Sequence, residues 1–100
     1  MLAMNDRFGS LRDATAAALL NGPAATSPEL RQQIAGGNPP PELTTLVDKV
    51  RSRAYTVTDH DLDQLRSRYT EDQLFEIVLC AAFGAANERL AAAHRALEEA

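Results

Sequence analysis

The sequence has little of what many folds and most catalytic sites are built from. Its 100 residues contain one cysteine, no tryptophan and only 5% aromatic residues. A single cysteine excludes a disulfide framework within the chain, and no cysteine–histidine grouping has the spacing of zinc ligands. The low aromatic content disfavours a β-sandwich. We therefore predict no cofactor and no metal ion.

Positive charge and long apolar runs are also lacking. Ten basic against fourteen acidic residues give a formal net charge of −4, which argues against a nucleic-acid or anionic-membrane partner. No stretch approaches the ~20 apolar residues that span a bilayer. Residues 1–7 have neither the basic nor the apolar part of a secretory signal. We expect one cytoplasmic domain over residues 1–100.

Alanine and leucine, two strong helix formers, dominate what is present. Glycine and proline divide the chain into five predicted helices, at about 6–20, 28–35, 43–54, 59–68 and 71 to near the C-terminus. Local start signals support this division. Ser27 is placed to cap one helix, and the pairs Thr58–Asp61 and Thr70–Gln73 form capping boxes at two others. The sequence thus predicts an all-α, compact helical bundle with a long C-terminal helix.

The last predicted helix is apolar on two faces. One face carries Leu74, Ile77, Val78, Ala81 and Ala85. The other carries Phe75, Leu79, Ala82, Phe83 and Ala86. A helix that is apolar on two faces must be covered on both. We expect the second face to be an oligomer interface; the alternative is that this helix is the fully buried centre of the fold.

Few residues could carry chemistry. Cys80 lies in the middle of the last helix, which predicts a buried, inert thiol. His60 could act as a general base if Asp61 or Glu76 lay beside it, but its place in a first helical turn indicates a solvated side chain. His94 is interpreted in the same way.

Two charged clusters have the composition of binding sites. Asp59, Asp61 and Asp63 have the opening spacing of a calcium loop, but the glycine and the final glutamate that such a loop needs are missing. The basic residues of the third and fourth predicted helices could form a patch if these helices lie together; they are Lys49, Arg51, Arg53, Arg66 and Arg68. The helix that would have to enter a DNA groove is apolar, so we predict no nucleic-acid binding.

Residues 46–90 resemble the C-terminal half of the carboxymuconolactone decarboxylase and alkylhydroperoxidase D-like family. The matching features are LVDKV at 46–50, VTD at 57–59, the pair Leu62 and Leu65, and a long helix ending in Asn87, Arg89 and Leu90. The resemblance implies an alkylhydroperoxidase D-like helical fold that self-associates, commonly as trimers or hexamers.

The catalytic motif of that family is absent. Its peroxidase members use a Cys-x-x-Cys pair and a nearby histidine ahead of the matched region, whereas residues 1–45 contain neither cysteine nor histidine. We therefore predict a non-catalytic, self-associating helical module with a structural or accessory role, its partner a second copy or another protein. The alternative is a peroxide-reducing or decarboxylase-type enzyme with a pocket between subunits, for which Cys80, His60 and Glu76 are the candidate residues.

Overall fold

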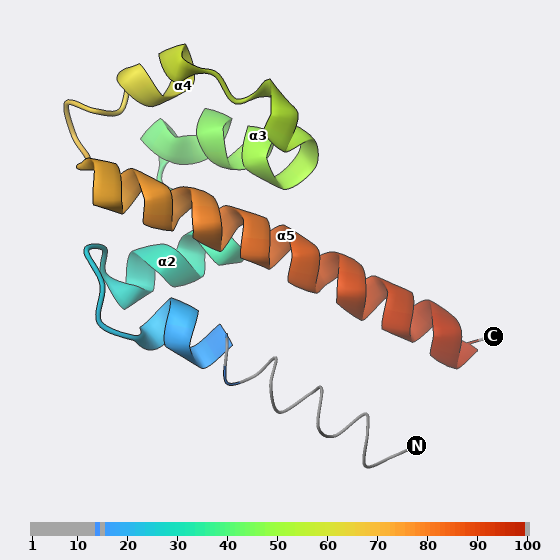
Figure 1. Ribbon diagram of the computed structural model, residues 1–100. Coiled ribbons are helices and arrows are strands. Elements are labelled where there is room, and N and C mark those ends of the chain that lie inside the picture. Colours follow the sequence, from blue (N-terminus) through green and yellow to red (C-terminus); the bar gives the residue numbers. More distant parts are fainter. Residues whose placement is uncertain (1–13, 15, 100) are drawn as a thin grey trace.

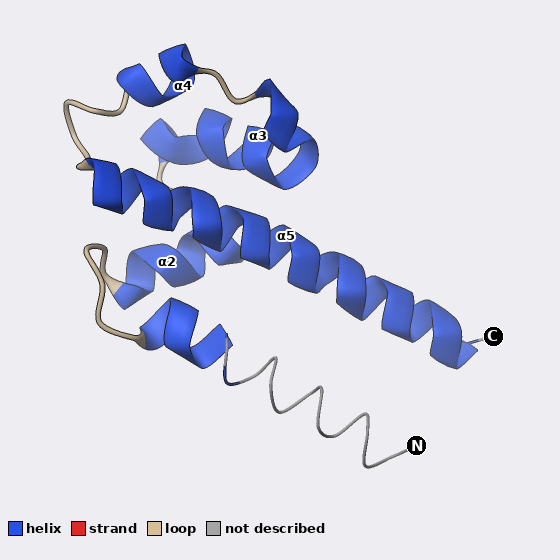
Figure 2. Ribbon diagram, viewed as in Figure 1, coloured by secondary structure: helices blue, strands red, loops and turns tan. Residues whose placement is uncertain are grey.

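A computed structural model describes residue 14 and residues 16–99, and all regular structure in them is helical. The elements in chain order are α2 (Pro28–Ala35), the 3₁₀ turn η1 (Pro41–Leu43), α3 (Thr44–Arg53), the 3₁₀ turn η2 (Ala54–Thr56), α4 (Asp59–Asp63) and α5 (Glu71–Glu99). Residues 14 and 16–21 are helical as well, and the rest of the first predicted helix, 6–13 and 15, lies outside the described residues. The predicted all-α fold with a long last helix is confirmed (Figure 2).

The long helix α5 is the element around which the others are arranged. It packs against α2 on one side and α3 on the other, and α4 lies on α3 (Figure 1). The core between them is made of Ile34, Leu43, Leu46, Val47, Val50, Leu65, Leu74, Ile77, Cys80 and Ala81. Among the described helices, none combines the length and the apolar character that crossing a bilayer requires.

Only the first half of α5 belongs to this core. The last core residue on it is Ala85, and between 86 and 99 every residue is exposed except the half-buried Ala91. A helix of 29 residues is about 44 Å long, close to the longest dimension of the molecule, 49 Å. The second half of α5 therefore projects beyond the other described helices, as Figure 1 shows.

The predicted capping devices are present. Thr70 Oγ1 accepts from the Gln73 amide at 3.1 Å, and Gln73 Oε1 accepts from the Thr70 amide at 2.9 Å. Thr58 and Asp61 form the same reciprocal pair at the start of α4. Each box satisfies amide groups that the first helical turn leaves without a partner, and so fixes where the helix begins.

The helix α4 is shorter than predicted. It ends at Asp63, and residues 64–68 form turns instead of the expected helix to Arg68. There the amides of Leu65 and Arg66 bond three residues back, to Leu62 and Asp63, which is the tighter 3₁₀ pattern. This tightening places Leu65 in the core, at 7% exposure, within reach of the start of α5.

Gly84 marks the point where the three main helices meet. The guanidinium of Arg51, on α3, donates to the carbonyl of Ala35, the last residue of α2, at 2.8 Å. A Cβ atom on Gly84 would overlap that carbonyl and lie 2.7 Å from Arg51 Nη1. Since the obstacle includes backbone, α2 could admit a methyl group here only by moving away from α5.

We expect Gly84→Ala to destabilise the fold by about 1–3 kcal/mol, because the overlap outweighs the roughly 1 kcal/mol that alanine gains in a helix. Urea denaturation followed by circular dichroism measures the change. The matched control is Ala92→Gly on the exposed part of the same helix, where the opposite exchange meets no neighbouring backbone and costs at most the roughly 1 kcal/mol of helix propensity. An unchanged or raised midpoint for Gly84→Ala would contradict the close approach of α2.

Candidate functional site

One side of α5 carries a row of apolar side chains that the other described elements leave uncovered. Phe75 is 68% exposed, Leu79 42%, Leu90 54% and Leu97 77%. The alanines between them are exposed, and Phe83 is half-buried. We call this row the apolar stripe of α5, and it consists of Phe75, Leu79, Ala82, Phe83, Ala86, Leu90, Ala93 and Leu97.

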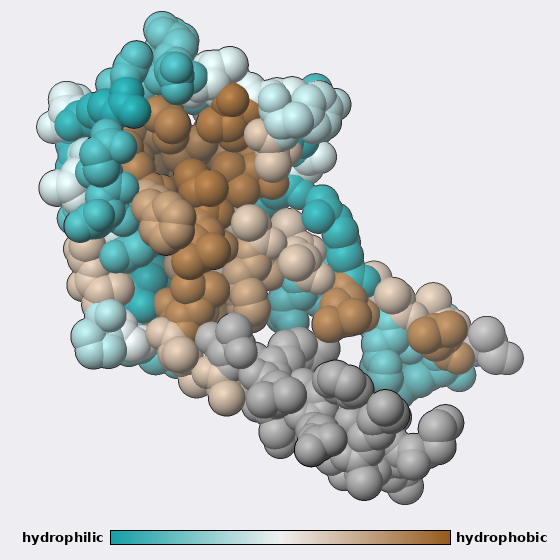
Figure 3. All heavy atoms as spheres, viewed as in Figure 1, coloured by the Kyte–Doolittle hydropathy of each residue, from teal (hydrophilic) through white to brown (hydrophobic). Residues whose placement is uncertain are grey.

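The stripe lies opposite the core side of the helix. An α-helix turns about 100° per residue, so residues spaced by three, four and seven share one side. The core residues Ile77, Cys80 and Ala81 fall on the other side and are fully buried. In Figure 3, hydrophobic surface gathers over the first half of α5 and the helices beside it, and reappears in separate areas along the projecting half.

The exposed apolar row is longer than the set of residues predicted as an interface. The five residues predicted from the sequence form the part of the stripe next to the core. Leu90, Ala93 and Leu97 continue it, and sequence reasoning missed them. The signal that could have found them is the spacing of seven that leads from Phe83 to Leu90 and on to Leu97.

A second feature lies beside α5, at the loop that leads into α2. The carboxylate of Glu76 accepts from the amides of Ala25 and Thr26, each at 2.8 Å, and from the Thr26 hydroxyl at 2.6 Å. These bonds join residues about fifty positions apart in the sequence. Glu76 therefore anchors the loop to α5.

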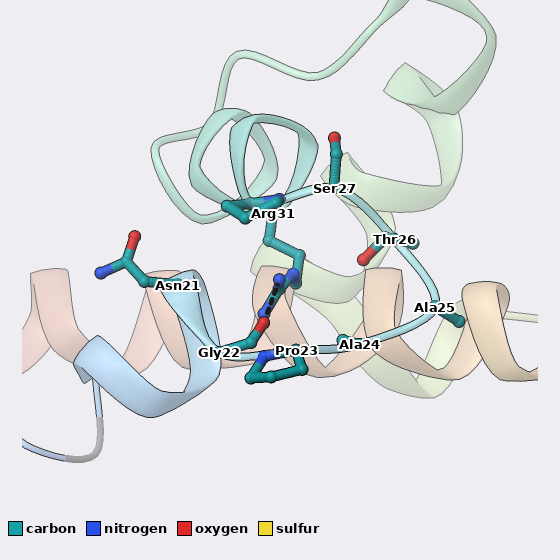
Figure 4. Close-up of a pocket in the computed structure, with 9 residues that line it drawn as sticks. Asn21, Gly22, Pro23, Ala24, Ala25, Thr26, Ser27 and Arg31 are labelled. Carbon is teal, nitrogen blue, oxygen red and sulfur yellow. Dashed lines mark hydrogen bonds between the residues drawn. The ribbon is translucent and has the colours of Figure 1, made fainter.

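Arg31 holds the same loop from the other side. Arg31 lies on α2 and is buried, with 2% of the residue exposed. The guanidinium donates to the carbonyls of Leu19, at 2.6 Å, and Gly22, at 2.5 Å; Figure 4 shows it reaching from α2 to the loop. These acceptors lie where the first helical segment ends, so Arg31 satisfies carbonyl groups that a helix end leaves without a partner.

An open pocket of about 500 Å³ lies within this loop, lined by residues 21–28 and Arg31. The charge available to a ligand there is small. Both Nη groups of Arg31 donate to backbone carbonyls, and its buried Nε has no hydrogen-bond partner among the described residues. Two loop amides and the Thr26 hydroxyl already bind Glu76. The contacts are those of a loop anchored to its own fold.

The hydrogen bonds set the pKa of Glu76. Burial acts to raise this pKa, but the Thr26 hydroxyl, the amides of Ala25 and Thr26 and the charge of Arg31 together lower it below its usual value. Donors aimed at a carboxylate stabilise its charged form. Glu76 is therefore an ionised anchor at neutral pH, and a protonated Glu76 would lose part of its hold on the loop.

Two of the candidate catalytic residues, Glu76 and Cys80, lie one turn apart on α5, and the charge of Arg31 acts on the pKa of both. Cys80 is fully buried, as predicted, and burial raises the pKa of its thiol, with a smaller opposite effect from Arg31 and a smaller raising one from Glu76. His60 is exposed, and its Nε2 lies 3.0 Å from the side-chain Nε2 of Gln64. Glu76 is bound to the loop before α2. No hydrogen bond in the described part of the chain joins any two of the three.

Five members of the two charged clusters form ion pairs: Asp61, Asp63, Lys49, Arg51 and Arg66. Asp61 accepts from Lys49 at 2.8 Å, and Asp63 pairs with Arg66. Arg51 pairs with Glu88. Over the described residues, no group of three or more histidine, cysteine, aspartate or glutamate side chains is placed to hold a metal ion. His94 contacts Glu98 at 3.0 Å on the exposed end of α5.

Replacing Glu76 by Gln tests the anchor. A carboxylate whose pKa is lower in the folded state stabilises the fold above its unfolded pKa of about 4.3, and this contribution is lost as the pH falls through the folded value. We expect Glu76→Gln to cost about 1–2 kcal/mol at pH 7, because a neutral amide replaces a charged acceptor. The difference from the wild type should shrink below pH 4.

Urea denaturation at pH 7 and at pH 3.5 measures that difference. The control is Glu99→Gln at the exposed end of α5, which should match the wild type at both pH values. Some acid sensitivity will persist in Glu76→Gln, because the hydrogen bond from Lys49 and the Thr58 amide also lower the pKa of Asp61. A constant difference between Glu76→Gln and the wild type at both pH values would show that the charge of Glu76 does not matter.

The burial of Cys80 predicts a thiol that reacts only when the fold opens. A disulfide reagent such as Ellman's needs access to a thiolate, and burial reduces both the access and the thiolate fraction. We expect less than one tenth of the cysteine to react within minutes at pH 8 in the native protein, and all of it in 6 M guanidinium chloride. Full, rapid reaction of the native protein would contradict the burial.

Comparison with protein-family models, with curated proteins and with solved structures finds no match to this chain. The functional argument therefore depends on the chain's own geometry, of which the apolar stripe of α5 is the feature that other described elements leave unpartnered.

Proposed function

We propose that this chain is a non-catalytic helical module that self-associates through the apolar stripe of α5 and has a structural or accessory role. The exposure of the stripe is the observation that carries the proposal. Phe75 and Leu97 stand near the two ends of the row, at 68% and 77% exposure. Each large apolar side chain that moves from water into an interface contributes roughly 1.5–3 kcal/mol, so such a row favours association.

The surface area supports an interface of ordinary size. The chain has 6813 Å² of accessible surface. A compact monomer of 10.8 kDa has about 5,500 Å². The excess, roughly 1,300 Å², exceeds the ~800 Å² per partner that a stable protein–protein interface buries. An elongated shape with a projecting apolar helix is what a subunit of an assembly looks like when it is taken alone.

Two further observations support the role. In the described part of the chain no hydrogen bond joins any two of Cys80, His60 and Glu76, and this favours a structural module over an enzyme, since a catalytic group needs its partners within hydrogen-bond reach. The resemblance of residues 46–90 to the carboxymuconolactone decarboxylase and alkylhydroperoxidase D-like family implies self-association, commonly into trimers or hexamers.

Light scattering over a concentration series tests the proposal. We expect a mass that is a multiple of 10.8 kDa for the wild type. Leu90→Glu should raise the dissociation constant at least tenfold, because it places a charge in an apolar contact. Leu90 lies beyond the core, so the melting temperature of the separated subunit should change little.

The matched control is Ala92→Glu, an exposed position of α5 outside the stripe, which should leave the mass unchanged. A wild-type protein that stays monomeric at all concentrations would contradict self-association. If Leu90→Glu lowered the melting temperature of such a monomer, the stripe would be covered within its own chain.

A further inference from the structure

We infer that two copies of the chain pair through the apolar stripe with their α5 helices antiparallel, about a two-fold axis that passes near Glu88. This inference rests on the proposed self-association and adds the occupant of the stripe and its orientation. The second copy contributes the projecting half of its own α5, which covers the exposed side of the core half in the first from Leu79 onward.

The spacing within the stripe is that of paired helices. From Leu79 the row continues through Phe83, Ala86, Leu90, Ala93 and Leu97, in alternate steps of four and three residues. Such steps give one apolar position every 3.5 residues on average, which keeps a seam facing a partner helix along its whole length. We call this row, from Leu79 to Leu97, the seam of the stripe. It runs without interruption from the core half of α5 into the projecting half.

The sizes along the seam decide the orientation. From the end of the core half onward, large and small side chains alternate, from Phe83 through Ala86, Leu90 and Ala93 to Leu97. In a parallel pair in register, each residue would meet its own copy. Layers of two alanines would then lie between layers of two large side chains, and the thin layers would leave voids that cost about 1 kcal/mol per missing methyl group.

Antiparallel pairing removes this mismatch. With the axis near residue 88, Phe83 faces Ala93 of the second copy, and Ala86 faces Leu90 of the second copy. Every alanine of the seam then meets a large side chain, which is how facing helices interdigitate. Leu79 faces Leu97 of the second copy, at the edge of each core.

The same pairing accounts for the shape of the subunit. The part of α5 after residue 85 is about 21 Å long, about the length of the core-bound part that lies before it. A two-fold axis between the halves lets each projecting half cover the core half of the other copy, so the contact closes on itself. Such a pair uses the surface in excess of a compact monomer, and it is also a unit from which a hexamer can be assembled.

The charges near the axis are held away from the seam. Arg89 donates to the carbonyl of Arg51 at 2.5 Å, and Glu88 pairs with the guanidinium of the same Arg51. Both side chains therefore bend toward the C-terminal end of α3 in their own subunit. Two copies of Arg89 that faced each other across the axis would repel, and this bond directs the side chain to its own subunit instead.

Pulsed electron paramagnetic resonance on the full chain tests the orientation. A nitroxide label is attached to a cysteine introduced at position 98 or at position 92, both exposed and outside the stripe, in a Cys80→Ala background. In the antiparallel pair the two labels are offset along the helices by about 30 Å at position 98 and about 12 Å at position 92. In a parallel pair in register the two labels have no offset along the helices, so positions 98 and 92 give similar distances.

A clearly longer distance at position 98 than at position 92 supports the antiparallel pair. Equal distances at the two positions overturn the orientation while self-association stands. A wild-type protein that light scattering shows to be monomeric overturns the proposed function itself, so the two failures are distinguishable. A second set of labelled proteins keeps Cys80, whose buried thiol takes up no label in the folded chain, and guards against misfolding of Cys80→Ala.

Discussion

The contact on which the rest of the fold depends is the close approach of α2 to α5 at Gly84. The side-chain hydrogen of this residue leaves room for the last carbonyl of α2, and Arg51 from α3 binds that carbonyl. One small residue and one cation thus fix three helices relative to one another. Because α2 and α3 occupy the two flanks of α5, the described elements leave the side that carries Phe75 and Leu79 uncovered.

Most charged groups near the core stabilise this chain's own backbone or pair with one another. Arg31 and Glu76 hold the loop before α2 from opposite sides, and Arg51 binds the end of α2. A buried charge is costly unless it is paired or hydrogen-bonded, and these side chains meet that condition through backbone groups. The polar contacts of Arg31, Arg51 and Glu76 are therefore structural, while the side of α5 that the described elements leave uncovered is apolar.

Local patterns in the sequence predicted the parts of the fold that local interactions determine. Helix starts at Thr58 and Thr70 depend on residues three positions away, and the two apolar faces of α5 depend on helical spacing, so both could be predicted. The burial of Arg31 and the anchor at Glu76 depend on contacts made across the fold, up to fifty-one positions apart. No periodic pattern encodes such contacts, and short-range signals also failed to predict that α4 ends at Asp63.

The length of α5 beyond its core has a consequence for how the helix itself forms. Starting a helix is costly while extending one is cheap, and alanine-rich helices shorter than about 12–15 residues are marginal in water. Residues 86–99 have little tertiary packing behind them, so their helix grows from the turn that Ala85 holds in the core. We therefore expect that segment to have the lowest opening free energy of α5, with hydrogen bonds that fray from the C-terminus inward. A partner that covered the stripe would therefore shift the helix–coil equilibrium of residues 86–99 as it bound. The helical order of these residues would then report how much of the stripe is covered.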